Sequence, residues 1–167
     1  LVKPKLILTS NKNAHNLDNL KISNIPIIKF NNSFAKSLKI ASVASVPNQL
    51  DPEDGLVILY TSGTTGFPKG ALISHRAQIA RMCALRLDAR ISHKDAFVAW
   101  SPMFHMASTD QLLSALMSGS TVIIIDGFQP DKITKAASNY SLGWLVMFPG
   151  SIKPMVEYLK KSKRKIK

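Results

Sequence analysis

The sequence has few of the residues that build covalently linked or metal-stabilised folds. Its 167 residues include one cysteine, Cys83, and four scattered histidines. One cysteine cannot form a disulfide within the chain, and the histidines show no zinc-ligand spacing. We therefore expect a fold held by its hydrophobic core, in a reducing, cytoplasmic setting.

Long hydrophobic runs are also missing. The longest apolar stretches, such as 121–125 and 144–148, are far shorter than the roughly 18 residues that a membrane-spanning helix needs. The sequence therefore predicts no transmembrane segment. It begins with Leu1 and shows no signal-peptide pattern, and we expect it to be a fragment of a longer protein.

Acidic residues are scarce, with 10 against 22 basic residues and a formal net charge of +12. Six of the basic residues lie in the last eight positions. A basic tail of this kind can bind nucleic acid or anionic lipid. Because no aromatic side chains alternate with these charges for base stacking, we interpret residues 160–167 as the solvated end of a truncated helix and predict no nucleic-acid partner. No pattern indicates an oligomeric state.

The remaining composition is that of an ordinary globular protein, with 46% hydrophobic and 19% charged residues. Apolar runs and helical patterns alternate along the chain. We predict strands at 5–9, 25–30, 56–60, 71–73, 96–100, 120–125 and 144–148. We predict helices at 10–20, 33–38, 75–87, 104–117, 129–139 and 152–161. This order indicates an α/β fold, with a mainly parallel sheet covered by helices on both faces and one domain over 1–167.

One loop carries an unusual concentration of small polar residues. Residues 61–70 read TSGTTGFPKG and lie between two apolar, strand-like runs. Glycines let the backbone approach a ligand, the hydroxyls donate hydrogen bonds, and Lys69 adds a positive charge. A simple hairpin needs only about 2–5 loop residues, and this loop has no acidic residue. We therefore interpret it as a polyphosphate site.

A Walker-type phosphate loop is the nearest alternative. Gly63 and Lys69 have the spacing of its first glycine and its lysine. However, Pro68 has no N–H to offer, and Gly70 replaces the hydroxyl that would bind a metal. We therefore expect side-chain hydroxyls, more than backbone amides, to contact the phosphates.

Residues 60–70 resemble the phosphate-binding signature of the adenylate-forming enzymes, which include acyl- and aryl-CoA synthetases, luciferases and peptide-synthetase adenylation domains. The resemblance implies that a carboxylate attacks the α-phosphate of ATP and that a thiol, usually of CoA, then displaces AMP. It implies a Mg²⁺ ion contacted by Thr61. The residues it assigns to the phosphates are Thr61, Ser62, Gly63, Thr64, Thr65, Gly66 and Lys69.

A second motif, SPMFHMAS, occupies residues 101–108. Pro102 keeps Ser101 extended, and the predicted helix places His105 on its first turn at the carboxyl end of a strand. Alone, such a histidine is more often a core residue. Residues 102–105 also resemble the Pro-x-Phe-His motif of acyl-CoA synthetases. The resemblance assigns catalytic roles to Lys69 and His105, and assigns acid binding to Phe104, His105 and Met106. It also places residues 148–151 near the substrate cavity.

The resemblance implies ATP-dependent activation of a fatty or other apolar carboxylic acid, followed by thioester formation with CoA. Two alternatives are an amino-acid adenylation domain, which usually has aspartate at position 105, and a non-catalytic nucleotide-binding module. The family's later motifs, including the Tyr-Gly-x-Thr-Glu segment and the adenylation lysine, do not occur in residues 1–167. We expect this piece alone to be inactive.

Overall fold

The structure is a computed structural model that describes residues 3–18, 20, 24–45, 49–61 and 66–162. The chain divides into two compact units, Leu1–Gln49 and Leu50–Lys167, and each is described by itself. Both units contain helices and strands, so the predicted α/β class is confirmed. None of the helices in the described ranges has the length and apolar character needed to cross a bilayer.

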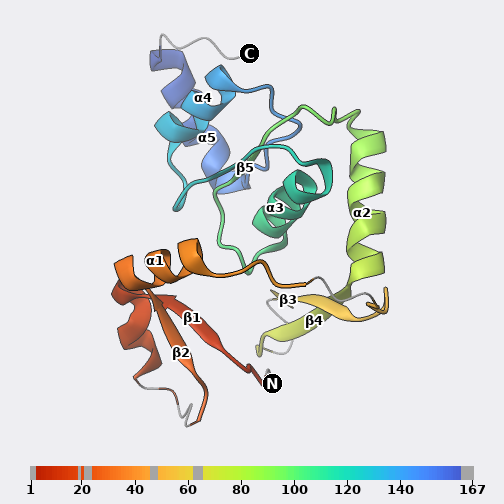
Figure 1. The fold of residues 1–167 in the computed structure, drawn as a ribbon. Coiled ribbons are helices and arrows are strands. Elements are labelled where there is room, and N and C mark those ends of the chain that lie inside the picture. The colour runs from red at the N-terminus through yellow and green to blue at the C-terminus, as the bar shows by residue number, and fades with distance from the viewer. Residues whose placement is uncertain (1–2, 19, 21–23, 46–48, 62–65, 163–167) are drawn as a thin grey trace. The chain divides into compact units, whose positions relative to one another are not determined.

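The first unit contains two parallel strands and two helical segments (Figure 1). Its elements are β1 (Ile7–Ser10), the 3₁₀ helix η1 (Asn11–Leu17), β2 (Ile27–Phe30) and α1 (Asn32–Ile40). Ser10 caps η1, where its hydroxyl accepts the N–H of Asn13 at 3.3 Å. None of the described residues in these two helices is buried, so this unit has little core of its own.

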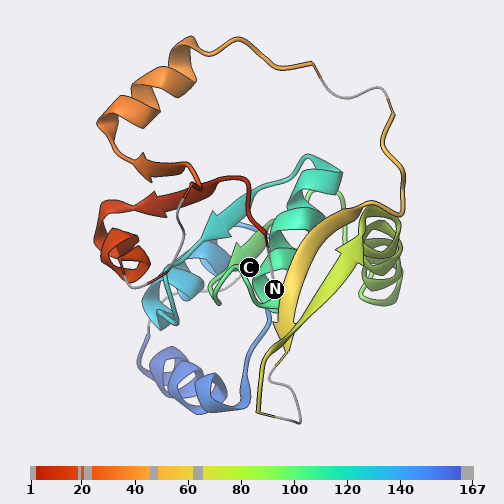
Figure 2. The same cartoon turned by 90° about the horizontal axis from the view of Figure 1, so that it is seen from below.

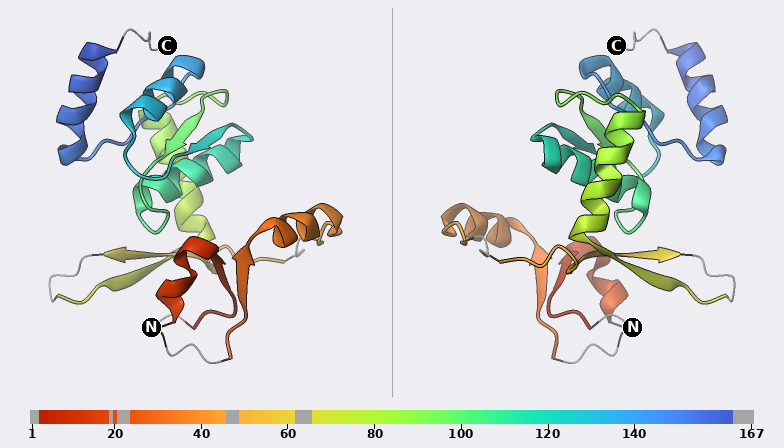
Figure 3. Two further views of the ribbon diagram at one scale, coloured as in Figure 1. Left: turned by 90° about the vertical axis from the view of Figure 1, so that its left-hand side faces the viewer. Right: turned by 90° about the vertical axis from the view of Figure 1, so that its right-hand side faces the viewer.

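The second unit contains the remaining elements and both motifs (Figure 2). They are β3 (Gly55–Thr61), β4 (Lys69–Ser74), α2 (His75–Asp88), β5 (Phe97–Ala99), α3 (Met106–Ser118), β6 (Val122–Ile124), α4 (Pro130–Asn139) and α5 (Pro149–Lys161). The helix α2 continues directly from β4, and Ser74 caps it by accepting the Ala77 N–H at 3.2 Å. This helix also lies against α3 (Figure 3).

Two of the three strand pairs are parallel, as predicted. β5 pairs with β6 in the register Phe97 to Val122. Parallel neighbours need a crossover connection, which α3 provides here. β3 and β4 are joined directly by the loop, so they pair antiparallel. Among the described residues the six strands form three separate pairs and not one continuous sheet.

The predicted strand at 144–148 is wrong. Within the described ranges this segment has no ladder partner, and only an isolated bridge joins Ala96 to Leu142 nearby. The run is apolar because Leu145, Met147 and Phe148 pack against the core. An apolar run of five residues does not by itself distinguish a strand from a buried loop.

The core of the second unit lies between the β5–β6 pair and helices α4 and α5. Its buried residues are Val98, Trp100, Ile125, Ile133, Ala136 and Met155. The Trp100 ring packs against those of Phe128 and Phe148, with centroids 5.2 and 5.1 Å away. Its indole N–H donates to the Val146 carbonyl at 2.8 Å. The core therefore fixes the loop 144–148 that borders the candidate site.

Candidate functional site

The β3–β4 hairpin brings the two ends of the glycine-rich loop together. Thr61 pairs with Lys69 in the ladder, and the Thr61 hydroxyl donates to the Lys69 carbonyl at 3.4 Å. Gly66 has φ of +83°, a left-handed conformation that glycine adopts without strain. The predicted phosphate ligands Ser62, Gly63, Thr64 and Thr65 lie outside the described residues.

Lys69 is the first residue of β4, and its side chain is exposed. None of the ion pairs found among the described residues involves it. An ammonium group at the mouth of a hydroxyl-rich loop, without a carboxylate partner in the described part of the chain, is available to an anionic ligand. The hairpin thus presents the charge that a phosphate site requires.

His105 is the N-cap of α3, so the helix begins two residues later than predicted. Its Nδ1 atom accepts the N–H of Ala107 at 3.1 Å. A ring nitrogen that accepts carries no proton, so in the neutral imidazole the proton is on Nε2. The ring also packs edge-on against Phe148, with centroids 5.1 Å apart. These two contacts fix His105 with an N–H donor available for a ligand.

Local hydroxyls hold the turn that carries His105. The Ser108 hydroxyl donates to the Ser101 carbonyl at 2.7 Å, and the Thr109 hydroxyl donates to the Met103 carbonyl at 2.8 Å. Both side chains belong to the first turn of α3 and fold the preceding segment back onto the helix. The SPMFHMAST sequence therefore supplies its own turn.

The two motifs meet in one cavity of about 450 Å³, which we call the first cavity. Leu59, Tyr60, Thr61 and Ala71 line it from the hairpin, and His105 and Met106 line it from the start of α3. This volume lies within the ~300–1,000 Å³ typical of small-molecule sites. Thr61, at the edge of the glycine-rich loop, and His105, from a distant part of the sequence, therefore line one ligand-sized space.

A second cavity of about 200 Å³ shares His105 and Met106 with the first. Its other lining residues are Arg81, Ala107, Asp110, Trp144, Val146 and Phe148. His105 therefore borders both spaces.

A family model described as AMP-binding enzyme matches residues 2–166. The chain belongs to this family. It is 31% identical over 93 residues to a 2-succinylbenzoate–CoA ligase of Bacillus cereus, covering 56% of this chain and 19% of that protein. It is 28% identical over 116 residues to 4-coumarate–CoA ligase 4 of Arabidopsis thaliana, covering 66% and 20%. The chain spans about a fifth of the length of these relatives.

Solved structures share the AMP-binding fold. Apo MatB from Rhodopseudomonas palustris superposes with a TM-score of 0.72 at 21% identity, covering 92% of this chain and 31% of that chain. The N-terminal domain of FACL13 from Mycobacterium tuberculosis, solved with an inhibitor, gives 0.64 at 26% identity, covering 81% and 35%. These likenesses confirm the predicted correspondence to part of the large domain of an acyl-CoA synthetase-like enzyme.

Of the three residues predicted to bind the acid, two line the cavities and one does not. His105 and Met106 line both cavities, and Phe148, from the segment predicted to lie near the substrate, lines the second. Phe104 is 66% exposed and lines neither of them. The aromatic neighbour of His105 at the site is therefore Phe148.

Sequence reasoning missed a polar network in the wall of the second cavity. Asp110 is 1% exposed, and its Oδ1 atom accepts the Nε2–H of Gln78 at 3.1 Å. Its Oδ2 atom accepts the Nε–H of Arg81 at 2.9 Å. A buried carboxylate needs this pairing, and the network joins α2 to α3. It was not visible in the sequence because it depends on how the two helices pack.

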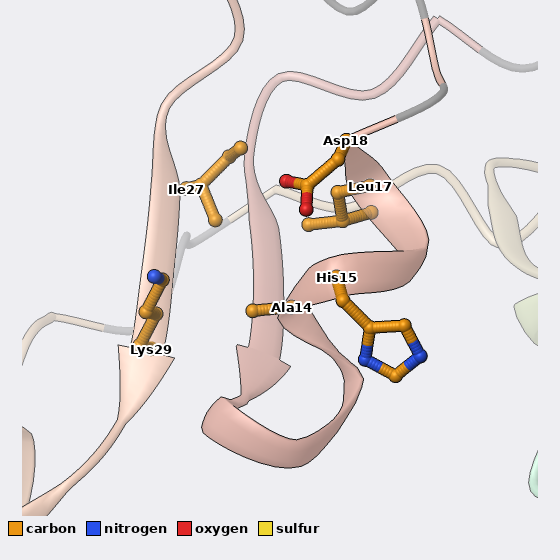
Figure 4. A pocket seen from close by; sticks show the side chains of 6 residues that line it. All are labelled: Ala14, His15, Leu17, Asp18, Ile27 and Lys29. Atoms are coloured by element: carbon orange, nitrogen blue, oxygen red, sulfur yellow. The ribbon is translucent and has the colours of Figure 1, made fainter.

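A further cavity of about 450 Å³ lies in the first unit, between η1 and β2 (Figure 4). It is lined by Ala14, His15, Leu17, Asp18, Ile27 and Lys29, none of which belongs to either motif. The imidazole of His15 turns away from Lys29 on the facing strand. Because this cavity contains no residue of the two motifs, it is not the candidate site.

Proposed function

We propose that the protein carrying this chain is an adenylate-forming acid–CoA ligase. It activates a carboxylic acid with ATP and transfers the acyl group to CoA. The observation that carries the proposal is the first cavity, where Thr61 of the phosphate loop and His105 of the second motif face the same space. Membership of the AMP-binding family and relatives named as CoA ligases support it.

At the phosphate end, the proposed ligands of the β- and γ-phosphates are the loop hydroxyls and Lys69. The Lys69 ammonium is exposed at the hairpin and stabilises the negative charge that develops as pyrophosphate leaves. The proposed protein contacts are Thr61, Ser62, Gly63, Thr64, Thr65, Gly66 and Lys69.

A Mg²⁺ ion bound with ATP would neutralise part of the phosphate charge. Mg²⁺ is usually held by one or two protein oxygens together with phosphates and water. The described residues contain no cluster of three or more His, Cys, Asp or Glu that would form a complete metal cage. The Thr61 hydroxyl at the first cavity therefore fits the role of a single protein contact to a phosphate-bound ion.

At the acid end, His105 positions the carboxylate. A carboxylic acid has a pKa of about 4 and is already a nucleophilic anion at neutral pH, so the reaction needs no general base. Because Nδ1 of His105 already accepts the Ala107 N–H, the Nε2–H is the group that donates a hydrogen bond to a carboxylate oxygen. His105 thereby holds the oxygen near the phosphate end of the first cavity without removing a proton.

An amino-acid substrate is disfavoured because position 105 is histidine, which does not pair with a substrate ammonium group. Asp110 is the acidic residue that lines the second cavity, and Arg81 and Gln78 already engage both of its oxygens. A second carboxylate partner for an ammonium group is therefore missing from the described lining of these cavities.

The test is carboxylate-dependent exchange between ATP and pyrophosphate, measured on the complete natural protein. We expect Lys69→Ala to slow this exchange about ten- to hundredfold, because a charge-assisted contact is worth roughly 1.5–3 kcal/mol. Lys94→Ala, at an exposed turn outside both motifs, is the matched control and should leave the rate unchanged. Absence of both ATP binding and exchange with every acid tried would contradict the proposed function.

A further inference from the structure

Trp100 stands between the core of the second unit and the turn that carries His105. It directly follows β5, is 7% exposed and belongs to the buried core. The next residue, Ser101, has its carbonyl held by the Ser108 hydroxyl at 2.7 Å, in the first turn of α3. Trp100 lines neither the first nor the second cavity. Its side chain can therefore influence a ligand in these spaces only through its neighbours.

The indole of Trp100 holds the loop 144–148 at two points. Its Nε1–H donates to the Val146 carbonyl at 2.8 Å, and its ring packs edge-on against Phe148 with centroids 5.1 Å apart. Phe148 is the N-cap of α5, and its carbonyl accepts both the N–H and the hydroxyl of Ser151, each at 2.8 Å. Edge-to-face aromatic contacts favour particular ring orientations. Trp100 and Ser151 together therefore fix where the Phe148 ring lies.

Phe148 passes this constraint to His105. The two rings meet edge to face, with centroids 5.1 Å apart and planes at 77°. The Ala107 N–H holds the imidazole at Nδ1 from its own turn, whereas Phe148 holds it from a segment distant in the sequence. The direction in which the Nε2–H of His105 points therefore depends on where Phe148 lies.

We propose that Trp100 is a positioning residue of the ligase reaction and acts through Phe148 on His105. It orients the imidazole so that the Nε2–H meets the carboxylate of the acid. The inference rests on the proposed ligase function and adds to it a residue that does not contact the reacting atoms. Because a misplacement of about 1 Å can reduce a rate about a hundredfold, such a residue controls how well the acid is used.

The experiment is steady-state pyrophosphate exchange with the complete natural protein, in which the acid and ATP are varied separately. The probe is whichever of benzoate, 3-phenylpropanoate, hexanoate and dodecanoate exchanges fastest. Trp100→Phe keeps a buried ring and removes the N–H that holds Val146. We expect KM for the acid to rise about three- to tenfold and KM for ATP to stay within about twofold.

The two KM values distinguish positioning from loss of fold. A variant that is merely less stable supplies less active enzyme, which lowers kcat and leaves both KM values unchanged. Unchanged KM for the acid in Trp100→Phe would overturn the inference, and so would an equal rise of both KM values.

Phe128→Leu is the matched control for Trp100→Phe. Phe128 also packs against the Trp100 ring, with centroids 5.2 Å apart, and lines neither cavity. Its loss removes a ring from the same core, while the indole keeps its contacts with Val146 and Phe148. We expect a lower unfolding temperature and unchanged KM for the acid. An equal rise of this KM in both variants would show a general effect of core packing and contradict the inference.

A double-mutant cycle with His105 tests the route of the effect. His105→Ser keeps a capping side chain for α3 and removes the imidazole. In this background Trp100→Phe should change KM for the acid by less than about twofold, because the group that it positions is gone. The same rise in both backgrounds would show that Trp100 acts without His105.

Crystal structures of the natural protein and of Trp100→Phe give the orientation of His105 without any acid. We expect the imidazole to turn, or to adopt more than one orientation, in the variant. An imidazole that stays in place would overturn the inference and leave the ligase function intact. Absence of exchange with every acid, together with absence of ATP binding, would instead remove the proposed function, and the crystal structures would still test whether Trp100 positions His105.

Discussion

At the proposed phosphate end of the candidate site the side chains stand on an exposed hairpin, whereas at the proposed acid end they stand on a buried polar network. Thr61 and Lys69 are exposed and make few contacts in the described chain. His105 belongs to a helix whose Asp110 is buried and paired with two residues of α2. We therefore expect substitutions on the hairpin to change the reaction rate without changing the stability of the fold. Substitutions in the network around Asp110 should reduce stability as well.

The largest stability effect is expected at Asp110. Asp110→Ala leaves the buried amide of Gln78 and the guanidinium of Arg81 without their shared partner. Breaking a fully buried pair costs about 3–5 kcal/mol. Because Arg81 is 41% exposed and regains water, we expect about 2–3 kcal/mol. Urea unfolding measures this loss.

Asp88→Ala, at the exposed end of α2, is the control for Asp110→Ala and should change the free energy of unfolding by less than about 0.5 kcal/mol. Equal effects of the two substitutions would show that the Asp110 network does not support the acid end.

A smaller loss of stability is expected at Ser74, where the β3–β4 hairpin continues into α2. Its hydroxyl caps α2 at the residue where β4 ends, so it fixes the angle between hairpin and helix. Ser74→Ala should cost about 1 kcal/mol in the free energy of unfolding, and Ser74→Asn, which also caps well, should restore most of it. Thermal unfolding of the three proteins tests this order, and an equal loss with asparagine would argue against the capping role.

The smallest stability effect is expected at Thr61. Thr61→Val preserves the branched shape that favours a strand and removes only an exposed hydroxyl with a 3.4 Å hydrogen bond. The free energy of unfolding should change by less than about 0.5 kcal/mol. The pyrophosphate exchange rate should nevertheless fall, because a proposed phosphate and Mg²⁺ contact is lost. A large loss of stability would contradict the expectation that substitutions on the hairpin leave the fold intact. An unaltered exchange rate would contradict the proposed contact of Thr61 with phosphate and Mg²⁺.

Much of the secondary structure followed from local sequence. The predicted helices at 75–87 and 129–139 correspond to α2 and α4 within one residue at each end. Ser74 supplies the cap of α2, and Pro130 occupies the first turn of α4. The strand predicted at 144–148 was wrong because hydrophobicity reports burial and does not report a hydrogen-bonded neighbour.

The candidate site was predictable to a lesser degree. The motifs identified Thr61, Lys69 and His105, and the structure brings Thr61 and His105 to one cavity. Arg81 and Trp144 had no sequence signal, since each is an ordinary member of a helix or of an apolar run. Phe104 stood beside His105 in the motif, yet Phe148 supplies the ring contact.

The sequence by itself determined the chemistry that the chain can offer: a loop of hydroxyls and glycines ending in one lysine, and a histidine after a Pro-Met-Phe turn. These are local patterns, fixed by residue type and spacing. Only the tertiary structure decided which groups face each other, because the packing of α2 on α3 and of loop 144–148 on the core depends on contacts between distant residues. Those contacts place Arg81, Asp110 and Trp144 around one cavity beside His105.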